Sequence, residues 1–219
     1  MRVTRRELCA GTAALALAGA IFGGRLDGFG FVLPAFADAS PEEVMTPGPL
    51  GDKSQGDPKA PVTLIEYAAV TCPHCSYFFL HEFPEIKSKY IDTGKVHFIF
   101  REFPLNALDV AGFMLARCAG EDKYFPIVDT LFEKQQEWVV QKPIEPLMAI
   151  AKQAGFTQQS FEECLKNQKI EDGIKWVRDR AAQTLGVSGT PTFFINGKKY
   201  TGNPTAADIG KEIDGYLKS

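Results

Sequence analysis

The sequence predicts an α/β domain whose two parts are separated by a long insertion of helices. Two short runs of β-branched and aromatic residues, at 62–67 and 96–100, flank a helical segment, and a third such run occurs late in the chain at 192–195. Between the second and third runs, residues 106–186 show helical periodicity. Because so long a loop is uncommon in a compact domain, we expect an all-helical subdomain with its own small core.

Composition and charge place the chain among soluble globular proteins. It has 219 residues, of which 45% are hydrophobic and 23% charged, and this length suits one domain with an insertion. The formal net charge is −3, and the sequence has no Lys- or Arg-rich run, no Gly-rich phosphate loop and no internal repeat. We therefore expect no nucleic-acid partner.

Residues 1–37 have the pattern of an export signal. The segment TRREL at residues 4–8 resembles a twin-arginine signal, and a short apolar run follows it. Small residues at Ala35 and Ala37 occupy the positions that a signal peptidase reads, which predicts cleavage after Ala37. The alternatives are cleavage after Ala20 and an uncleaved anchor, which the shortness of the apolar run disfavours. We expect an exported, periplasmic protein.

Two segments lie between this signal and the insertion. Residues 38–60 are polar and rich in Pro, Gly and Asp, so we expect a lead-in arm with room for one short edge strand. Residues 61–105 make the first part of the α/β domain. Their helix should span 73–91, where Pro84 is expected to kink or break it because proline lacks an N–H group.

The insertion and the end of the chain also carry helix and strand signals. In residues 106–186, one apolar helical face carries Cys118, and Thr157 is a suitable N-cap. Further helices are expected at 123–136, 143–154, 158–167 and 170–185. Residues 187–219 form the second part of the α/β domain, in which Asn196-Gly197 predicts a hairpin and a last helix spans 205–217.

Cysteine usage fits an oxidising compartment. Cys9 lies in the export signal, and the even number that remains suggests two disulfides. Cys72 and Cys75 are three residues apart and are expected to pair, which leaves Cys118 with Cys164. Each of the latter two lies on an apolar helical face, so two buried free thiols are the alternative to a structural disulfide.

The motif Cys72-Pro73-His74-Cys75 lies where a predicted strand meets a predicted helix. Unpaired N–H groups and the dipole at a helix start favour an anion, so the pKa of the Cys72 thiol should fall. Pro73 suits a first helical turn, and His74 can donate a hydrogen bond or carry positive charge near the sulfur. Cys75, one turn further on, is expected to resolve mixed disulfides.

A Cys-x-x-Cys pair can also form half of a zinc site, which needs two more ligands. The sequence has no second such pair and no His-x-x-x-His, and His81 and His97 stand alone. We therefore expect no metal, and a redox-active Cys72–Cys75 disulfide in place of a cofactor.

Two features outside the motif support redox chemistry. Glu66 lies on the strand before the motif, so it is either an exposed edge residue or a buried acid that accepts the proton of Cys75. Thr190-Pro191 precede the strand at 192–195, where the missing N–H of proline is tolerated. A cis bond there would leave the backbone of Thr190 free to pair with an extended substrate.

The runs APVTLIEYAAVTCPHC and GTPTFFINGK, with helices between them, resemble the DsbA family of thioredoxin-fold proteins over nearly all of residues 48–219. The resemblance implies a thioredoxin fold with an inserted all-helical subdomain. It also implies that Cys72 is the attacking thiol, Cys75 the resolving thiol, Glu66 the buried acid and Pro191 the cis proline.

The same resemblance implies partners and a direction of reaction. The expected activity is donation of the Cys72–Cys75 disulfide to unfolded or reduced exported proteins, with reoxidation by a DsbB-like, quinone-linked membrane protein. We expect a monomer. Thr190 stands where the best-known oxidases carry Val and where related isomerases commonly carry Thr, so an isomerase or reductase is the alternative. A copper chaperone using the two thiolates is a further alternative, although no Met- or His-rich tract accompanies the motif.

Overall fold

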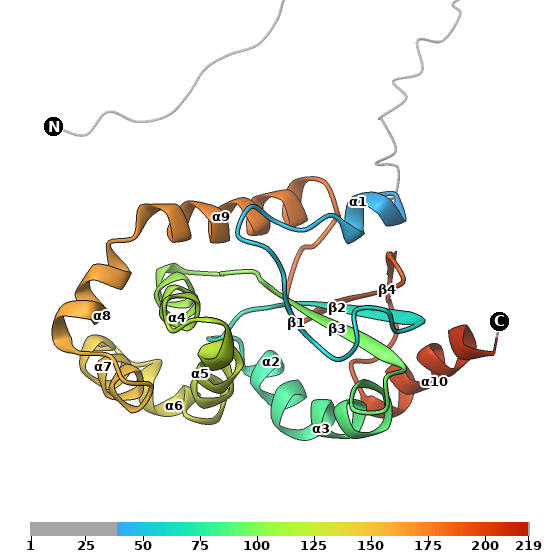
Figure 1. Cartoon of the computed structure of the whole chain (residues 1–219), viewed down its shortest axis with the longest axis horizontal. Helices are drawn as coiled ribbons and strands as arrows, with labels where there is room; N and C mark the ends of the chain where they lie inside the picture. Colours follow the sequence, from blue (N-terminus) through green and yellow to red (C-terminus); the bar gives the residue numbers. More distant parts are fainter. Residues whose placement is uncertain (1–38, 219) are drawn as a thin grey trace, which may run out of the picture. The chain divides into compact units, whose positions relative to one another are not determined.

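A mixed five-stranded sheet organises the fold, with strand order β1-β3-β2-β4-β5 (Figure 1). The computed structural model describes residues 39–218. Strands β2 (Val62–Ala68) and β3 (Val96–Glu102) run parallel, and β4 (Thr192–Ile195) pairs antiparallel with the other side of β2. Every residue of β2 is buried, as expected for a central strand that is covered on both faces.

The edges of the sheet come from the two ends of the described chain. Strand β1 (Lys53–Gln55) pairs antiparallel with β3, so the lead-in arm supplies the short edge strand that was predicted. Strand β5 (Lys198–Lys199) pairs antiparallel with β4. Asn196 and Gly197 join them with φ values of 48° and 78°, the positive pair that a two-residue hairpin turn requires.

Helices cover both faces of the sheet, as Figure 1 shows. One face carries Ile65, Tyr67 and Ile99 in an apolar cluster with residues of α1 (Pro41–Met45) and α9 (Gln168–Gln183). Side chains alternate along a strand, so Leu64 and Glu66 point to the opposite face. That face is covered by α2 (Pro73–Tyr77), α3 (Phe83–Ile86) and α10 (Ala206–Leu217).

The helical run at 73–91 passes through Pro84 without breaking. Two π-helical segments, η1 (Phe78–Glu82) and η2 (Lys87–Ile91), alternate with α2 and α3. Pro84 lies in the first turn of α3, directly after η1. A proline at the start of a helical segment costs little, because the first N–H groups there need no helical partner. The interruption expected at Pro84 is therefore a change of helical pitch rather than a break.

The insertion forms a block of helices between β3 and β4 in the chain. Its members are α4 (Ala107–Cys118), α5 (Glu121–Glu133), α6 (Gln135–Trp138), α7 (Ile144–Gln153) and α8 (Gln158–Leu165), followed by α9. Thr157 caps α8 as predicted, with its side chain accepting from the N–H of Ser160. Asn106 caps α4 by accepting from the N–H groups of Leu108 and Asp109.

The expectation that this block has its own core is wrong. Its buried aromatic and aliphatic side chains belong to the same apolar cluster as Leu64 and Phe98 of the sheet. Phe100 of β3 connects the sheet to the block through edge-to-face contacts with Phe113 and Phe132, at ring-centre distances of 6.1 and 6.4 Å. The helical block and the sheet therefore share one core.

A disulfide ties two helices of the block together. It joins Cys118, the last residue of α4, to Cys164 in α8, with their Cα atoms 6.1 Å apart. The bond closes a loop with a sequence separation of 46 residues. On the chain-entropy account such a closure stabilises the fold by about 4 kcal/mol.

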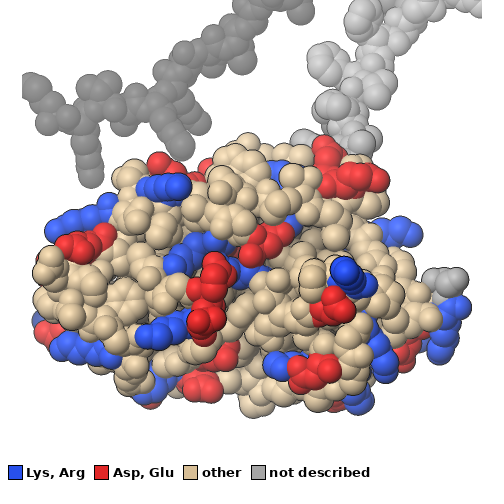
Figure 2. All heavy atoms as spheres, in the orientation of Figure 1, with Lys and Arg blue, Asp and Glu red and all other residues tan. Residues whose placement is uncertain are grey.

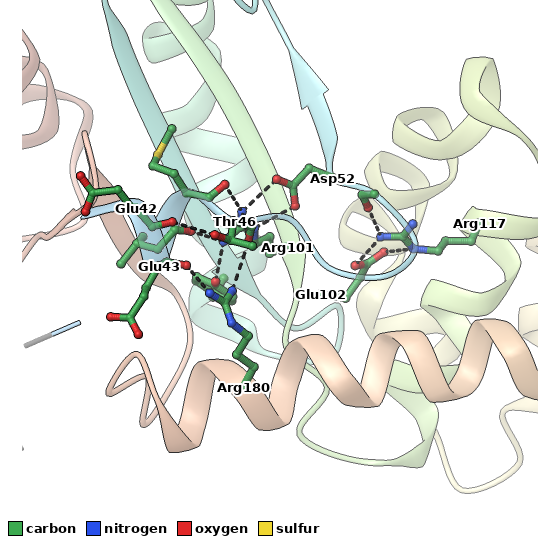
Figure 3. Close-up of polar contacts among 12 residues, drawn as sticks. Glu42, Glu43, Thr46, Asp52, Arg101, Glu102, Arg117 and Arg180 are labelled. Carbon is green, nitrogen blue, oxygen red and sulfur yellow. Dashed lines mark hydrogen bonds and ion pairs between the residues drawn. The ribbon is translucent and has the colours of Figure 1, made fainter. Parts of the chain in front are cut away.

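Three arginines hold the lead-in arm in place (Figure 3). Arg101 of β3 is 2% exposed and donates both to the two carboxylate oxygens of Asp52, at 2.9 Å each, and to the carbonyl of Val44 at 2.6 Å. Arg180 of α9 donates to the carbonyl groups of Glu43 and Thr46. The arm is thus fixed to β3 and α9 through its backbone carbonyls and the Asp52 carboxylate.

The third arginine links the arm to the helical block. Arg117 of α4 forms a buried pair with Glu102 at 2.6 Å and also donates to the carbonyl of Leu50 at 3.0 Å. The hydroxyl of Tyr124 donates to the same Glu102 carboxylate at 2.8 Å. These bonds satisfy a carboxylate that would be costly to bury alone.

One face of the protein carries charged side chains of both signs. On the face drawn in Figure 2, acidic and basic side chains are interspersed between uncharged areas. Within residues 39–218, no helix has both the length and the apolar composition needed to cross a membrane. The predicted export signal at residues 1–37 lies outside the described part of the chain.

Candidate active site

Cys72 caps the start of α2, just past the carboxyl end of β2. Its side chain is 6% exposed, and its sulfur lies 3.4 Å from the carbonyl oxygen of Thr190. The first turn of α2 presents the N–H groups of His74 and Cys75 to this sulfur. The fold thus places the first thiol of the motif at a helix start, where negative charge is favoured.

The surroundings of Cys72 lower the pKa of its thiol from 9.0 to about 5. A hydrogen bond from the Cys75 thiol contributes most, and the backbone N–H groups of Cys75 and His74 add to it, while burial acts in the opposite direction. The Thr190 hydroxyl also lowers this pKa. It is buried with no other partner among residues 39–218, so its O–H can turn toward a charged sulfur. At neutral pH the reduced protein therefore carries a thiolate at Cys72.

Cys75 has the opposite character, although it lies only one turn away. Its side chain is fully buried. Burial raises the pKa of its thiol far above the ordinary value, and the hydrogen bond to Cys72 and the charge of Glu66 raise it further. The two thiols, both free in this structure, therefore differ in nucleophilicity: Cys72 reacts as a thiolate and Cys75 holds its proton.

Glu66 is a buried acid beneath this pair. Its side chain is 0% exposed, and neither carboxylate oxygen has a hydrogen-bond partner within the described residues. Burial raises the pKa of Glu66 to about 8, and negative charge on Cys72 adds to the rise. The alternative of an exposed edge residue is excluded, because β3 and β4 pair with β2 on both sides of this position.

Most of the other residues predicted for the site lie near the motif, and one pair of cysteines lies apart from it. The Thr190–Pro191 bond is cis, and the Thr190 carbonyl faces Cys72. Pro73 and His74 are exposed at the rim, and the contribution of His74 to the Cys72 pKa comes from its backbone N–H. The Cys118–Cys164 disulfide lies apart, within the helical block.

Two residues of the insertion hold the backbone of the site, and the sequence analysis did not identify either. Asp109, fully buried in α4, accepts from the N–H of Thr71 at 2.7 Å, from its hydroxyl at 2.9 Å, and from the N–H of Leu105 at 2.9 Å. Burial raises the pKa of Asp109, while the Thr71 hydrogen bonds oppose the rise. Thr71 directly precedes Cys72, so Asp109 fixes the approach to the nucleophile.

Gln135 of α6 holds the same segment. Its amide donates to the carbonyl of Val70 at 2.8 Å and to that of Cys72 at 3.1 Å. From the sequence alone, a polar residue in a helix is usually assigned to the solvent-exposed face. For that reason the burial of Asp109 and Gln135 was not predicted. The insertion thus positions the site through buried polar bonds.

The described residues contain no group of three or more His, Cys, Asp or Glu side chains that could hold a metal ion. The reactive groups that the fold brings together are one stabilised thiolate, one buried thiol and one buried carboxyl. This set can exchange disulfides and move a proton between Cys75 and Glu66.

Replacing Glu66 with Gln should change how stability depends on pH. In the unfolded chain Glu66 ionises near 4.5, whereas in the fold it keeps its proton up to about pH 8. The folded state binds more protons over this window, so its free energy of unfolding should fall as pH rises, and Glu66→Gln should abolish that fall. In the oxidised protein Cys72 carries no charge, and burial is left to raise the pKa of Glu66. Denaturant titrations of that form should show the free energy of unfolding of the variant increasing relative to wild type as the pH rises above 4.5. An advantage that stays constant with pH would show that Glu66 ionises normally.

Comparisons with known proteins agree with this geometry. The chain matches the thioredoxin family over residues 50–215. It is 33% identical over 168 residues to a Rickettsia bellii protein named as a protein-disulfide oxidoreductase, and the match covers 74% of this chain but 65% of that one. The chain therefore spans less than two thirds of the length of this relative.

Two further matches extend over most of both proteins. The chain is 30% identical over 179 residues to disulfide bond formation protein D of Bacillus anthracis, covering 76% of this chain and 78% of that one. The crystal structure of Wolbachia pipientis alpha-DsbA1 superposes with a TM-score of 0.74 at 36% identity, covering 82% of this chain and 97% of that one. These matches confirm the predicted thioredoxin fold with helices inserted in it. The chain belongs to the thioredoxin family and, within it, to the DsbA-like proteins.

Proposed function

We propose that this protein is a thiol–disulfide oxidoreductase that donates its Cys72–Cys75 disulfide to reduced proteins. The observation that carries the proposal is the difference between the two thiols: the pKa of Cys72 is lowered to about 5, whereas that of Cys75 is raised. A stabilised thiolate at Cys72 favours the reduced form, and a protein whose reduced form is favoured is an oxidant toward its substrates.

The exchange proceeds in two balanced steps. A substrate thiolate attacks the sulfur of Cys72, which forms a mixed disulfide and breaks the Cys72–Cys75 bond. Cys75 leaves as a thiolate and takes a proton, for which the protonated carboxyl of Glu66 is the buried donor. A second substrate thiolate then attacks the substrate sulfur of the mixed disulfide. Cys72 leaves as a thiolate that its site stabilises, and the substrate is left with a new disulfide.

The site residues take distinct parts in this scheme. Cys72 is the sulfur that bonds to substrate, and Cys75 is the resolving thiol. Glu66 handles the proton beneath them. Thr190 and Pro191 lie beside Cys72, and an extended substrate can pair there with the Thr190 backbone.

The predicted export signal and the family support the proposed location and partners. We place the protein in the periplasm after export through the twin-arginine pattern of residues 4–8, with reduced exported proteins as substrates. A DsbB-like, quinone-linked membrane protein is the proposed oxidant that restores the disulfide. Cell fractionation of the full-length chain tests the location.

The roles of the two cysteines can be separated by trapping. Cys75→Ser should attack a disulfide-containing peptide and remain linked to one half of it, because no second thiol is left to release the peptide. Cys72→Ser is the matched control and should form no adduct, since burial keeps the remaining thiol protonated. Non-reducing mass spectrometry measures both. Equal adduct formation by Cys72→Ser would reverse the assignment.

The direction of the reaction can be read from the reduction potential. Equilibration of wild type with glutathione buffers should give a value well above the roughly −270 mV of thioredoxin, because the Cys72 thiolate stabilises the reduced form. A thioredoxin-like value would favour a reductase and would be inconsistent with disulfide donation.

A further inference from the structure

The chain reaches Cys72 through a tight turn. The N–H of Cys72 donates to the carbonyl of Ala69 at 3.1 Å, so residues 69–72 form a β-turn with Val70 and Thr71 at its centre. The peptide between these two central residues is trans and planar, so its N–H and its carbonyl point in opposite directions. Neither group takes part in the bond that closes the turn, and each needs a partner elsewhere.

The inserted helices supply both partners. Asp109 of α4 accepts from the N–H of Thr71 at 2.7 Å. Gln135 of α6 donates to the carbonyl of Val70 at 2.8 Å. Two helices of the insertion therefore hold the opposite edges of a single rigid peptide, and rotation of that peptide would break both bonds at once.

Further contacts keep the turn against the insertion. The amide of Gln135 also donates to the carbonyl of Cys72 at 3.1 Å, so one side chain bonds the turn and the start of α2 together. Val70 is fully buried and packs over Gly112 of α4, where a Cβ atom would lie only 3.1 Å from its Cγ2 atom. The turn is thus held by side-chain packing as well as by hydrogen bonds.

The position of the Cys72 sulfur depends on this turn. Cys72 is the N-cap of α2, a helix of five residues, and its side chain makes no capping bond there. The sulfur lies 3.4 Å from the Thr190 carbonyl and next to the N–H groups of the first helical turn. Rotation of the Val70–Thr71 peptide changes the φ angle of Thr71, which directly precedes Cys72, and would move the sulfur away from these groups.

We propose that Asp109 and Gln135 are a pair of positioning residues, which hold the Val70–Thr71 peptide in one orientation and so keep the Cys72 sulfur at the start of α2. The inference rests on the proposed function and adds to it the part of the fold that sets the reactivity of the disulfide. Because both bonds hold one rigid peptide, loss of either bond weakens the other. The sulfur then loses the N–H groups that favour its charge.

Hydrogen exchange tests the link between the two bonds. Gln135→Met removes both donated bonds and keeps a long side chain that favours a helix. In this variant the N–H of Thr71 should exchange with solvent at least about fivefold faster than in wild type, although its own acceptor, Asp109, is unchanged. Nuclear magnetic resonance measures this amide. Tyr124→Phe is the matched control, because it removes a buried hydrogen bond of the insertion, to Glu102, outside the turn. It should leave the Thr71 N–H protected.

Titration of the thiolate tests the effect on the sulfur. Gln135→Met and Asp109→Leu should each raise the midpoint for Cys72 from about pH 5 by about one pH unit or more, whereas Tyr124→Phe should keep the wild-type midpoint. The equilibrium constant for oxidation of glutathione should fall by about tenfold in the same two variants, because a less stabilised thiolate makes the disulfide less oxidising. A variant with both substitutions should shift the midpoint no further than the larger single shift, since one lost bond already frees the peptide.

Gln135→Met leaves the Asp109 carboxylate in place and decides the question by itself if Asp109→Leu does not fold. A wild-type midpoint and wild-type exchange of the Thr71 N–H in Gln135→Met would overturn the inference and leave disulfide donation intact. Single shifts that add up in the double variant, or an equal shift in Tyr124→Phe, would do the same, because the two bonds would then act independently or through general stability. A midpoint near 9 in the wild-type protein would overturn the proposed function and the inference with it.

Discussion

The sulfur of Cys72 lies at the start of α2, where backbone N–H groups, the Cys75 thiol and the Thr190 hydroxyl all favour negative charge on it. The other groups of the site respond to that charge. Burial keeps the proton on Cys75, and burial together with the Cys72 charge keeps it on Glu66. One charge can be accommodated in this small volume, and the fold assigns it to the sulfur nearest the surface.

This arrangement depends on elements far apart in the sequence. The motif itself lies at the β2–α2 junction. Thr190, whose carbonyl contacts the Cys72 sulfur, lies in the segment before β4. Asp109 and Gln135 of the insertion hold the backbone of residues 70–72 by hydrogen bonds. The inserted helices thus contribute to the geometry of the site as well as to the shape of the surface around it, because they share one core with the sheet.

Local patterns predicted much of this structure. Strand and helix periodicity placed the sheet and the insertion, Asn196-Gly197 marked the hairpin, and Thr157 marked a helix start. The shared core was not predictable, because an apolar helical face does not reveal which surface will cover it. The same applies to Arg101 and Asp52, whose bond joins residues 49 positions apart. Asp109 and Gln135 were missed because only the tertiary fold turns these polar helix residues inward.

The central claim is that the fold makes Cys72 a thiolate at neutral pH and leaves Cys75 a thiol. Thiolate absorbance in the ultraviolet, followed against pH in the reduced protein with Cys72→Ser as the reference, measures this directly. The account predicts a single transition with a midpoint near pH 5 that is missing from the reference variant. A midpoint near 9, the ordinary pKa of the thiol, would contradict it.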